Sequence, residues 1–148
     1  MGQIANQIQR FLKDIPVNIT LVAVSKTKPN EDILEAYHAG HKIFGENKVQ
    51  ELVAKAEVLP KDIEWHYIGH LQRNKVKYIG PFVQLIHGVD SLKLLKEINK
   101  QARKLEREIP CLLQFHIASE ETKFGLDMDE AKELLKQFAA NDYKNVRI

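Results

Sequence analysis

Apolar residues along this chain fall into two kinds of segment. Short runs rich in β-branched residues predict strands buried on both faces, and apolar residues spaced three and four apart predict amphipathic helices. The predicted helices are about 2–14, 31–39, 48–58, 72–78, 91–107 and 127–141. The predicted strands are about 19–25, 42–47, 63–69, 82–89, 110–117 and 144–148. A helix followed by alternating strands and helices indicates a parallel sheet with right-handed crossovers.

Residues with strong terminal preferences mark the helix boundaries. Asn30 is expected to cap the second helix, and Asp90 or Ser91 the fifth, because their side chains can accept from free backbone N–H groups. Gly40 is expected to end the second helix and Pro60 the third.

Two architectures fit this alternation: an open, doubly wound sheet, or part of a (β/α)₈ barrel. The first strand is not followed by G-x-G-x-x-G, and G-x-x-x-x-G-K-[ST] is absent from the chain, so nucleotide-binding versions of the open sheet lack their usual mark. A complete barrel takes roughly 250 residues, or about 200 at its smallest. With 148 residues and six predicted strands, the barrel interpretation makes this chain a fragment that ends inside a strand.

Composition narrows the class of protein. A hydrophobic fraction of 44% and a charged fraction of 28% are typical of soluble globular domains. The net charge of +2 predicts no strong attraction to nucleic acids or membranes. We find no secretory signal and no apolar run of membrane-spanning length. The single Cys111 excludes an intramolecular disulfide and is expected to be a buried, inert thiol, so we expect a cytoplasmic protein.

Lys26 is the residue with the clearest chemical potential. It follows the first predicted strand, and α/β folds place their chemistry at the carboxyl ends of strands. Most lysines are solvated surface groups, but burial at a strand end disfavours the charged form. A neutral amine can attack a carbonyl and form a Schiff base. The residue alone does not identify the carbonyl compound.

Other polar residues are predicted at the same rim. Together with Lys26 they follow five successive strands, and the four others are Asn47, His70, Asp90 and Ser119. Loops are polar in any protein, and Asp90 or Ser91 is better explained as a helix cap. Arg73, Lys75 and Lys77 are interpreted as a solvated helix face rather than a nucleic-acid site.

The histidines do not predict a metal site. His66 and His70 on one strand would be about 13 Å apart, at roughly 3.3 Å per residue, which is too far to share an ion. His87 and His116 lie on other predicted strands, without a carboxylate at ligand spacing.

Five stretches together resemble the pyridoxal phosphate homeostasis proteins (the YggS/PROSC family). They are AVSKTKP at 23–29, FGENKVQE at 44–51, WHYIGHLQRNK at 65–75, HGVDS at 87–91 and SEETKFG at 119–125. The resemblance covers nearly the whole chain from about residue 19. It implies a (β/α)₈ TIM-type barrel of the alanine racemase N-terminal-domain type that holds pyridoxal 5′-phosphate (PLP), here truncated at about strand six.

The resemblance also implies roles for individual residues. Lys26 matches the Schiff-base lysine at the end of strand one, and Asn47 matches an asparagine that lines the cofactor pocket. Residues 1–148 are then a single, incomplete PLP-binding domain, with helix 2–14 and about five and a half β/α units. In such barrels the phosphate sits by the loops after strands seven and eight, so its ligands are expected beyond residue 148.

Function follows from the same resemblance. We expect a protein that buffers, carries or delivers PLP, with PLP-dependent apoenzymes as partners and without a catalytic or metal-binding residue. A racemase-like PLP enzyme is the alternative, and it would need a second acid/base residue from another domain. A barrel that acts only through protein contacts, without PLP, is the third possibility. Two unpaired sheet edges predict association between chains.

Overall fold

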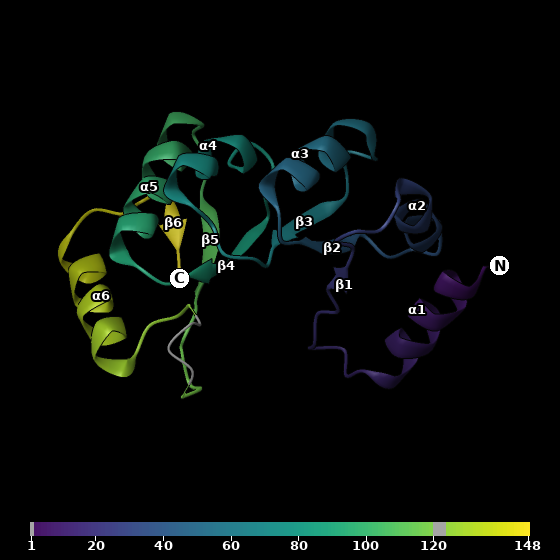
Figure 1. Cartoon of the computed structure of the whole chain (residues 1–148), viewed down its shortest axis with the longest axis horizontal. Helices are drawn as coiled ribbons and strands as arrows, with labels where there is room; N and C mark the ends of the chain where they lie inside the picture. Colours follow the sequence, from purple (N-terminus) through teal and green to yellow (C-terminus); the bar gives the residue numbers. More distant parts are fainter. Residues whose placement is uncertain (1, 120–123) are drawn as a thin grey trace.

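The computed structural model describes residues 2–119 and 124–148 (Figure 1). Within these residues it contains six parallel strands: β1 (Ala23–Val24), β2 (Ile43–Glu46), β3 (Glu64–Tyr67), β4 (Leu85–Val89), β5 (Ile109–Leu113) and β6 (Val146–Arg147). The helices are α1 (Gln3–Asp14), α2 (Asn30–His38), α3 (Val49–Val58), α4 (Val76–Ile79), α5 (Leu92–Lys104) and α6 (Met128–Ala140), with a 3₁₀ turn η1 (Arg73–Lys75).

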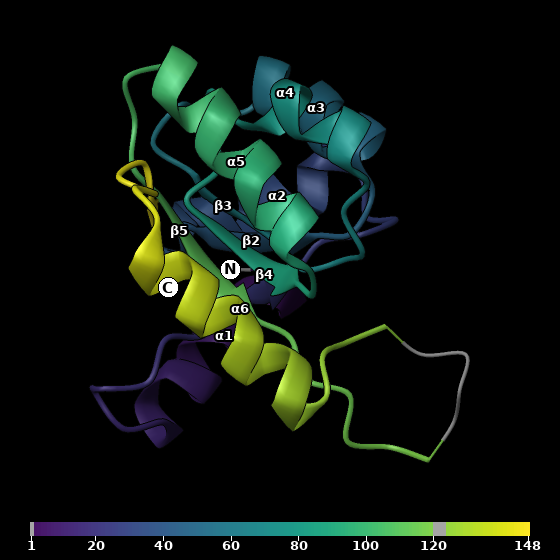
Figure 2. The ribbon, with the colours of Figure 1, turned by 90° about the vertical axis from the view of Figure 1, so that its left-hand side faces the viewer.

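The strand order decides between the two predicted architectures. Each strand pairs with the next one in the chain, so the order is β1-β2-β3-β4-β5-β6. An open, doubly wound sheet reverses its order at a switch point, whereas a β/α barrel keeps sequence order. Figures 1 and 2 show α3, α4 and α5 together on one side of the strands. The fold is therefore the barrel type, represented by six consecutive strands in the described residues.

The core lies between the sheet and the helices. Successive strand residues point to opposite faces, and one set is buried: Phe44, Trp65, Tyr67, Ile86, Ile109 and Cys111. These residues form one cluster with helix residues that include Leu52, Leu95 and Ile98. Strand residues of the other face are more open, with Val24 53% and Leu112 46% exposed. The sheet thus buries the face toward the helices and leaves the opposite face partly uncovered.

Several predicted boundaries are confirmed. Ser91 caps α5 by accepting from the Leu94 N–H at 3.1 Å. Gly40 has a φ of +99° just after α2, a conformation that favours glycine. Cys111 is buried, and burial raises the pKa of its thiol to about 12.

The first strand is shorter than predicted. Residues 19–25 were expected to form a strand buried on both faces, but β1 contains only Ala23 and Val24, and Ile19 is exposed. Among the described residues β1 has a single strand neighbour, β2, and one of its faces is not covered, so pairing and burial stop early. Asn30 is the first residue of α2 rather than its cap, because Pro29 occupies the N-cap position. No described helix is long and apolar enough to cross a membrane.

Candidate functional site

The predicted rim exists, and four of its five residues lie at the same edge of the sheet. Asn47 and Asp90 directly follow β2 and β4, while Lys26 lies two residues beyond β1 and His70 three residues beyond β3. Because the strands are parallel, their carboxyl ends share this edge. Ser119 does not directly follow its strand but is exposed in the loop after β5, and part of the 119–125 motif lies outside the described residues.

Lys26 and Asn47 are neighbours on this rim. Val24 is in register with Gly45, and the Ser25 N–H continues the pairing by donating to the Gly45 carbonyl at 3.0 Å. Continuing this register by two residues places Lys26 beside Asn47. Asn47 is half-buried, but the Lys26 side chain is exposed. The burial expected around Lys26 is therefore not observed, because the covered face of the sheet is the opposite one.

The backbone makes a strained turn directly after Lys26. Thr27 has a φ of +63°, which is unfavourable for a β-branched residue. The turn is closed by the Lys28 N–H, which donates to the Ser25 carbonyl at 3.1 Å. Strain of this kind costs roughly 1–3 kcal/mol and persists only where surrounding contacts enforce it.

A buried polar network lies beneath this turn, and the sequence did not predict it. Glu46 is fully buried and Lys55 is 6% exposed. Lys55 Nζ donates to Glu46 Oε1 at 2.6 Å, to Glu51 Oε1 at 2.9 Å and to the Ser25 carbonyl at 2.7 Å. Ser25 Oγ donates to the second oxygen of Glu46 at 3.0 Å. Glu46 and Lys55 form a hydrogen-bonded ion pair, which offsets the cost of burying the two charges.

Opposing effects act on the carboxylates of this network. Burial raises the pKa of Glu46, while Lys55 and Ser25 act to lower it. The hydrogen bond from Lys55 lowers the pKa of the more exposed Glu51. The available sequence signals were an acid inside an apolar strand and the i, i+4 spacing of Glu51 and Lys55.

Asn47 is held from the neighbouring strand. The Tyr67 hydroxyl lies within hydrogen-bond distance of two rim carbonyls, those of Asn47 at 3.0 Å and His70 at 3.1 Å. Burial raises the pKa of Tyr67, which favours the protonated, donating hydroxyl. Gly69 packs directly on Asn47, since a Cβ at position 69 would lie 2.5 Å from the Asn47 carbonyl oxygen.

Gly69→Ala is expected to destabilise the fold by about 2 kcal/mol, within the usual range for inserting a group into filled space. The atoms it would meet belong mainly to the Asn47 backbone, so they cannot rotate away. Urea unfolding measures the effect. Gly80→Ala is the matched control, because its Cβ would meet its nearest atoms, Leu105 Cδ1 and the Val76 carbonyl oxygen, at 3.2 and 3.3 Å rather than at 2.5 Å. Equal stability of the two variants would contradict the prediction.

Two further contacts were not predicted. The His70 ring stacks on Phe124, with centroids 3.7 Å apart, so the loop after β5 reaches the rim.

His66 Nδ1 and His87 Nε2 are 2.9 Å apart across β3 and β4. Burial and the nearby His87 lower the pKa of His66 to about 4. No group of three His, Cys, Asp or Glu residues that could hold a metal ion occurs among the described residues.

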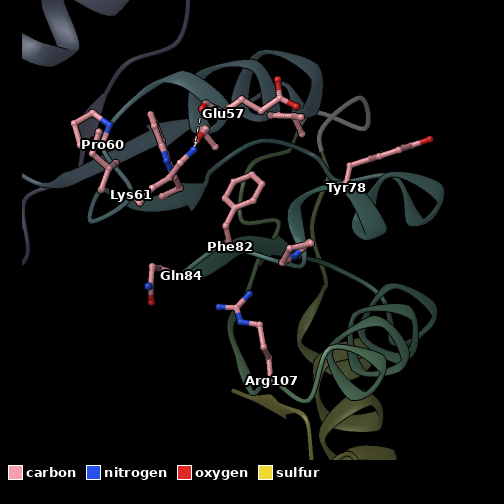
Figure 3. A pocket seen from close by; sticks show the side chains of 12 residues that line it. Glu57, Pro60, Lys61, Tyr78, Phe82, Gln84 and Arg107 are labelled. Atoms are coloured by element: carbon pink, nitrogen blue, oxygen red, sulfur yellow. Dashed lines mark hydrogen bonds between the residues drawn. The ribbon is translucent and has the colours of Figure 1, made fainter.

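A separate hollow of about 550 Å³ lies by the amino ends of β3 and β4 (Figure 3). Its two cations contact backbone carbonyls: Lys61 donates to Ala56 and Glu57 at the end of α3, and Arg107 donates to Val83 at 2.9 Å and to Gly80. Burial lowers the pKa of Arg107. These cations stabilise a helix end and a loop, so the rim with Lys26 is the better candidate site.

Comparison with known proteins gives concordant matches. The family model of the alanine racemase N-terminal domain matches residues 1–148. The pyridoxal phosphate homeostasis protein of Aquifex aeolicus (strain VF5) is 45% identical over 117 residues, covering 78% of this chain and 51% of that protein. The human protein of the same name is 35% identical over 148 residues, covering 93% and 54%. The chain spans about half the length of these curated relatives.

Solved structures agree with the sequence matches. PipY of Synechococcus elongatus PCC7942, with PLP bound, superposes with a TM-score of 0.89 at 35% identity, covering 99% of this chain and 68% of PipY. Alanine racemase of Bartonella henselae, with covalently bound pyridoxal phosphate, gives a TM-score of 0.73 at 16% identity, which is a likeness of fold alone.

Proposed function

The chain belongs to the alanine racemase N-terminal domain family and, within it, to the pyridoxal phosphate homeostasis proteins, and from this we propose that it binds PLP and takes part in PLP homeostasis. The observation that carries the proposal is the PLP bound to PipY, whose fold matches nearly all of this chain at 35% identity. The residues at the rim are chemically suited to the group, since they include an exposed primary amine and, beside it, the amide of Asn47.

We propose that Lys26 holds PLP through a Schiff base. PLP, when bound, supplies an aldehyde that reacts with amines. A bond forms between Lys26 Nζ and the aldehyde carbon, and one water is released. Lys26 is exposed at the rim and therefore accessible to a ligand. Asn47, held by Tyr67 and Gly69, is proposed to line the same pocket.

We further propose carriage of PLP rather than turnover, in the cytoplasm, with PLP-dependent apoenzymes as recipients. The support is the shared name of the curated relatives, which describes homeostasis and not a reaction. The likeness to alanine racemases is at 12–16% identity, and that to a histidine racemase is at 10%, so these matches carry over the fold without the activity. Exchange of an amino acid α-proton at enzymatic rates would favour the racemase-like alternative instead.

Borohydride trapping tests the assignment of Lys26. PLP is added, the protein is reduced, and the labelled peptide is mapped by mass spectrometry. We expect the adduct on Lys26 and its loss in Lys26→Ala. Lys28→Ala is the matched control, because Lys28 is also exposed and only two residues away. An undiminished adduct in Lys26→Ala, or no specific adduct on the unsubstituted chain, would contradict the proposal.

The open face of the sheet supports a proposal of self-association. Val24 and Leu112 are about half exposed there, and within residues 2–119 and 124–148 the strands β1 and β6 each have one strand neighbour. Exposed apolar faces and unpaired edges favour contact between chains. Sedimentation velocity should therefore detect dimers or larger species, and the double change Val24→Lys and Leu112→Lys should shift the chain toward the monomer. A monomeric parent chain at high concentration would refute this.

A further inference from the structure

One buried network contacts the backbone on both sides of Lys26. The Ser25 carbonyl accepts from Lys55 Nζ at 2.7 Å, and the Thr27 N–H donates to Glu51 Oε1 at 2.7 Å. These two backbone groups belong to the two peptide units that flank Lys26. Lys55 and Glu51 are bonded to each other at 2.9 Å on α3. The network therefore fixes the orientation of both peptide groups of Lys26.

The network is itself rigidly mounted. An ammonium has three donors, and Lys55 has three acceptors, in Glu46, Glu51 and Ser25. Its Glu46 partner is fully buried in β2. Helix α3, which carries Lys55 and Glu51, is anchored by the buried Leu52. Movement of the Lys26 backbone would thus have to break contacts with both a strand and a helix.

The strained turn indicates that these contacts hold the backbone in an unfavourable conformation. Thr27 has the left-handed φ of +63°, which an isolated threonine avoids. The bond from its N–H to Glu51 is one of the contacts that oppose relaxation of this angle. If the bond were absent, Thr27 could return to a negative φ, and the direction of the preceding residue, Lys26, would change.

We infer that Glu51 and Lys55 are positioning residues for Lys26: acting through the Thr27 N–H and the Ser25 carbonyl, they hold its amine in the orientation needed for reaction with PLP. The inference deepens the proposed function and rests on it for the role of Lys26. Neither residue needs to touch the cofactor. Glu51 and Lys55 act by keeping the Lys26 amine in place. A misplaced reacting group would react more slowly.

A pair of substitutions at position 51 separates the hydrogen bond from mere packing. Glu51→Gln keeps an oxygen that can accept from Thr27 and Lys55, whereas Glu51→Leu keeps side-chain volume and removes the acceptor. Glu51 is partly exposed, and in Glu51→Leu the Lys55–Glu46 pair remains, so both variants are expected to fold. Glu57→Leu is the matched control, because Glu57 is an exposed acid on the same helix.

The readout is the rate of PLP adduct formation on Lys26, trapped with borohydride and mapped by mass spectrometry. We expect Glu51→Leu to slow this rate by about tenfold or more, and Glu51→Gln and Glu57→Leu to stay within about threefold of the parent chain. Urea unfolding of each variant reports stability separately. Equal rates for Glu51→Leu and Glu51→Gln would overturn the inference.

Hydrogen exchange of the Thr27 amide gives a second measurement, which requires no PLP. The amide should exchange faster in Glu51→Leu than in Glu51→Gln. Faster exchange with an unchanged adduct rate would refute positioning and leave the proposed function intact. Absence of an adduct on the parent chain would instead contradict the proposed function, and unchanged exchange in Glu51→Leu would refute the contact itself.

Discussion

Replacing Lys55 by methionine is expected to destabilise the fold by roughly 3–5 kcal/mol, the usual effect of removing one partner of a buried ion pair. Methionine preserves much of the chain length but removes all three hydrogen bonds of the ammonium. Glu46, fully buried, would lose its 2.6 Å contact and keep only the Ser25 hydroxyl. Since burial already raises the pKa of Glu46, loss of Lys55 should raise it further and favour the protonated acid.

Urea unfolding at pH 7 measures this effect, and two variants define its origin. Lys42→Met breaks an ion pair of the same 2.6 Å length, but both partners are half exposed, so we expect less than about 1 kcal/mol. Combining Lys55→Met with Glu46→Gln removes the unpaired charge and should recover much of the loss. If Lys55→Met were as mild as Lys42→Met, the network would not be the rigid support inferred above.

Much of the fold could be predicted from the sequence because its elements are locally encoded. Apolar spacing separated strands from helices, and Gly40 and Ser91 marked real boundaries. The length of β1 could not be predicted in this way. Residues 19–22 have the composition of a strand, but pairing and burial depend on neighbours, and in the described part of the chain β2 is the one strand beside β1. Tertiary context overrides local preference at such an edge.

In the candidate site too, positions set by the local sequence could be predicted, and contacts between distant segments could not. The rim positions of Lys26 and Asn47 could be predicted because a residue after a parallel strand must lie at the common rim, while their roles toward PLP stay a prediction. Lys55 could not, because a helical lysine is normally solvent-exposed, and its burial follows from the docking of α3 on β2. The His66–His87 contact was also missed. Spacing along one strand excluded His66 and His70 as partners, whereas His66 meets His87 only through the register of β3 with β4.

Acid is expected to destabilise the fold through the buried His66–His87 pair. The free energy of unfolding should fall by roughly 3 kcal/mol between pH 7 and pH 4. The pKa of His66 is about 4 in the folded chain, compared with an ordinary value of 6.5. Between these values the unfolded chain binds a proton that the folded chain does not, so acid favours unfolding. This contribution is fully present above pH 6.5 and is lost as the pH falls toward 4. Burial lowers the pKa of His87 in the same direction.

Urea unfolding at steps from pH 7 to pH 4 measures the loss, and His66→Asn isolates its source. Asparagine does not titrate, but its amide lies near the position of Nδ1 and can still meet His87 Nε2. The variant should therefore lose less stability with acid than the parent chain, while carboxylates titrate in both. His38→Asn is the control, because it removes an exposed histidine that is not part of this pair. If His66→Asn and His38→Asn gave the same slope, the histidine pair would not be the origin of the acid sensitivity.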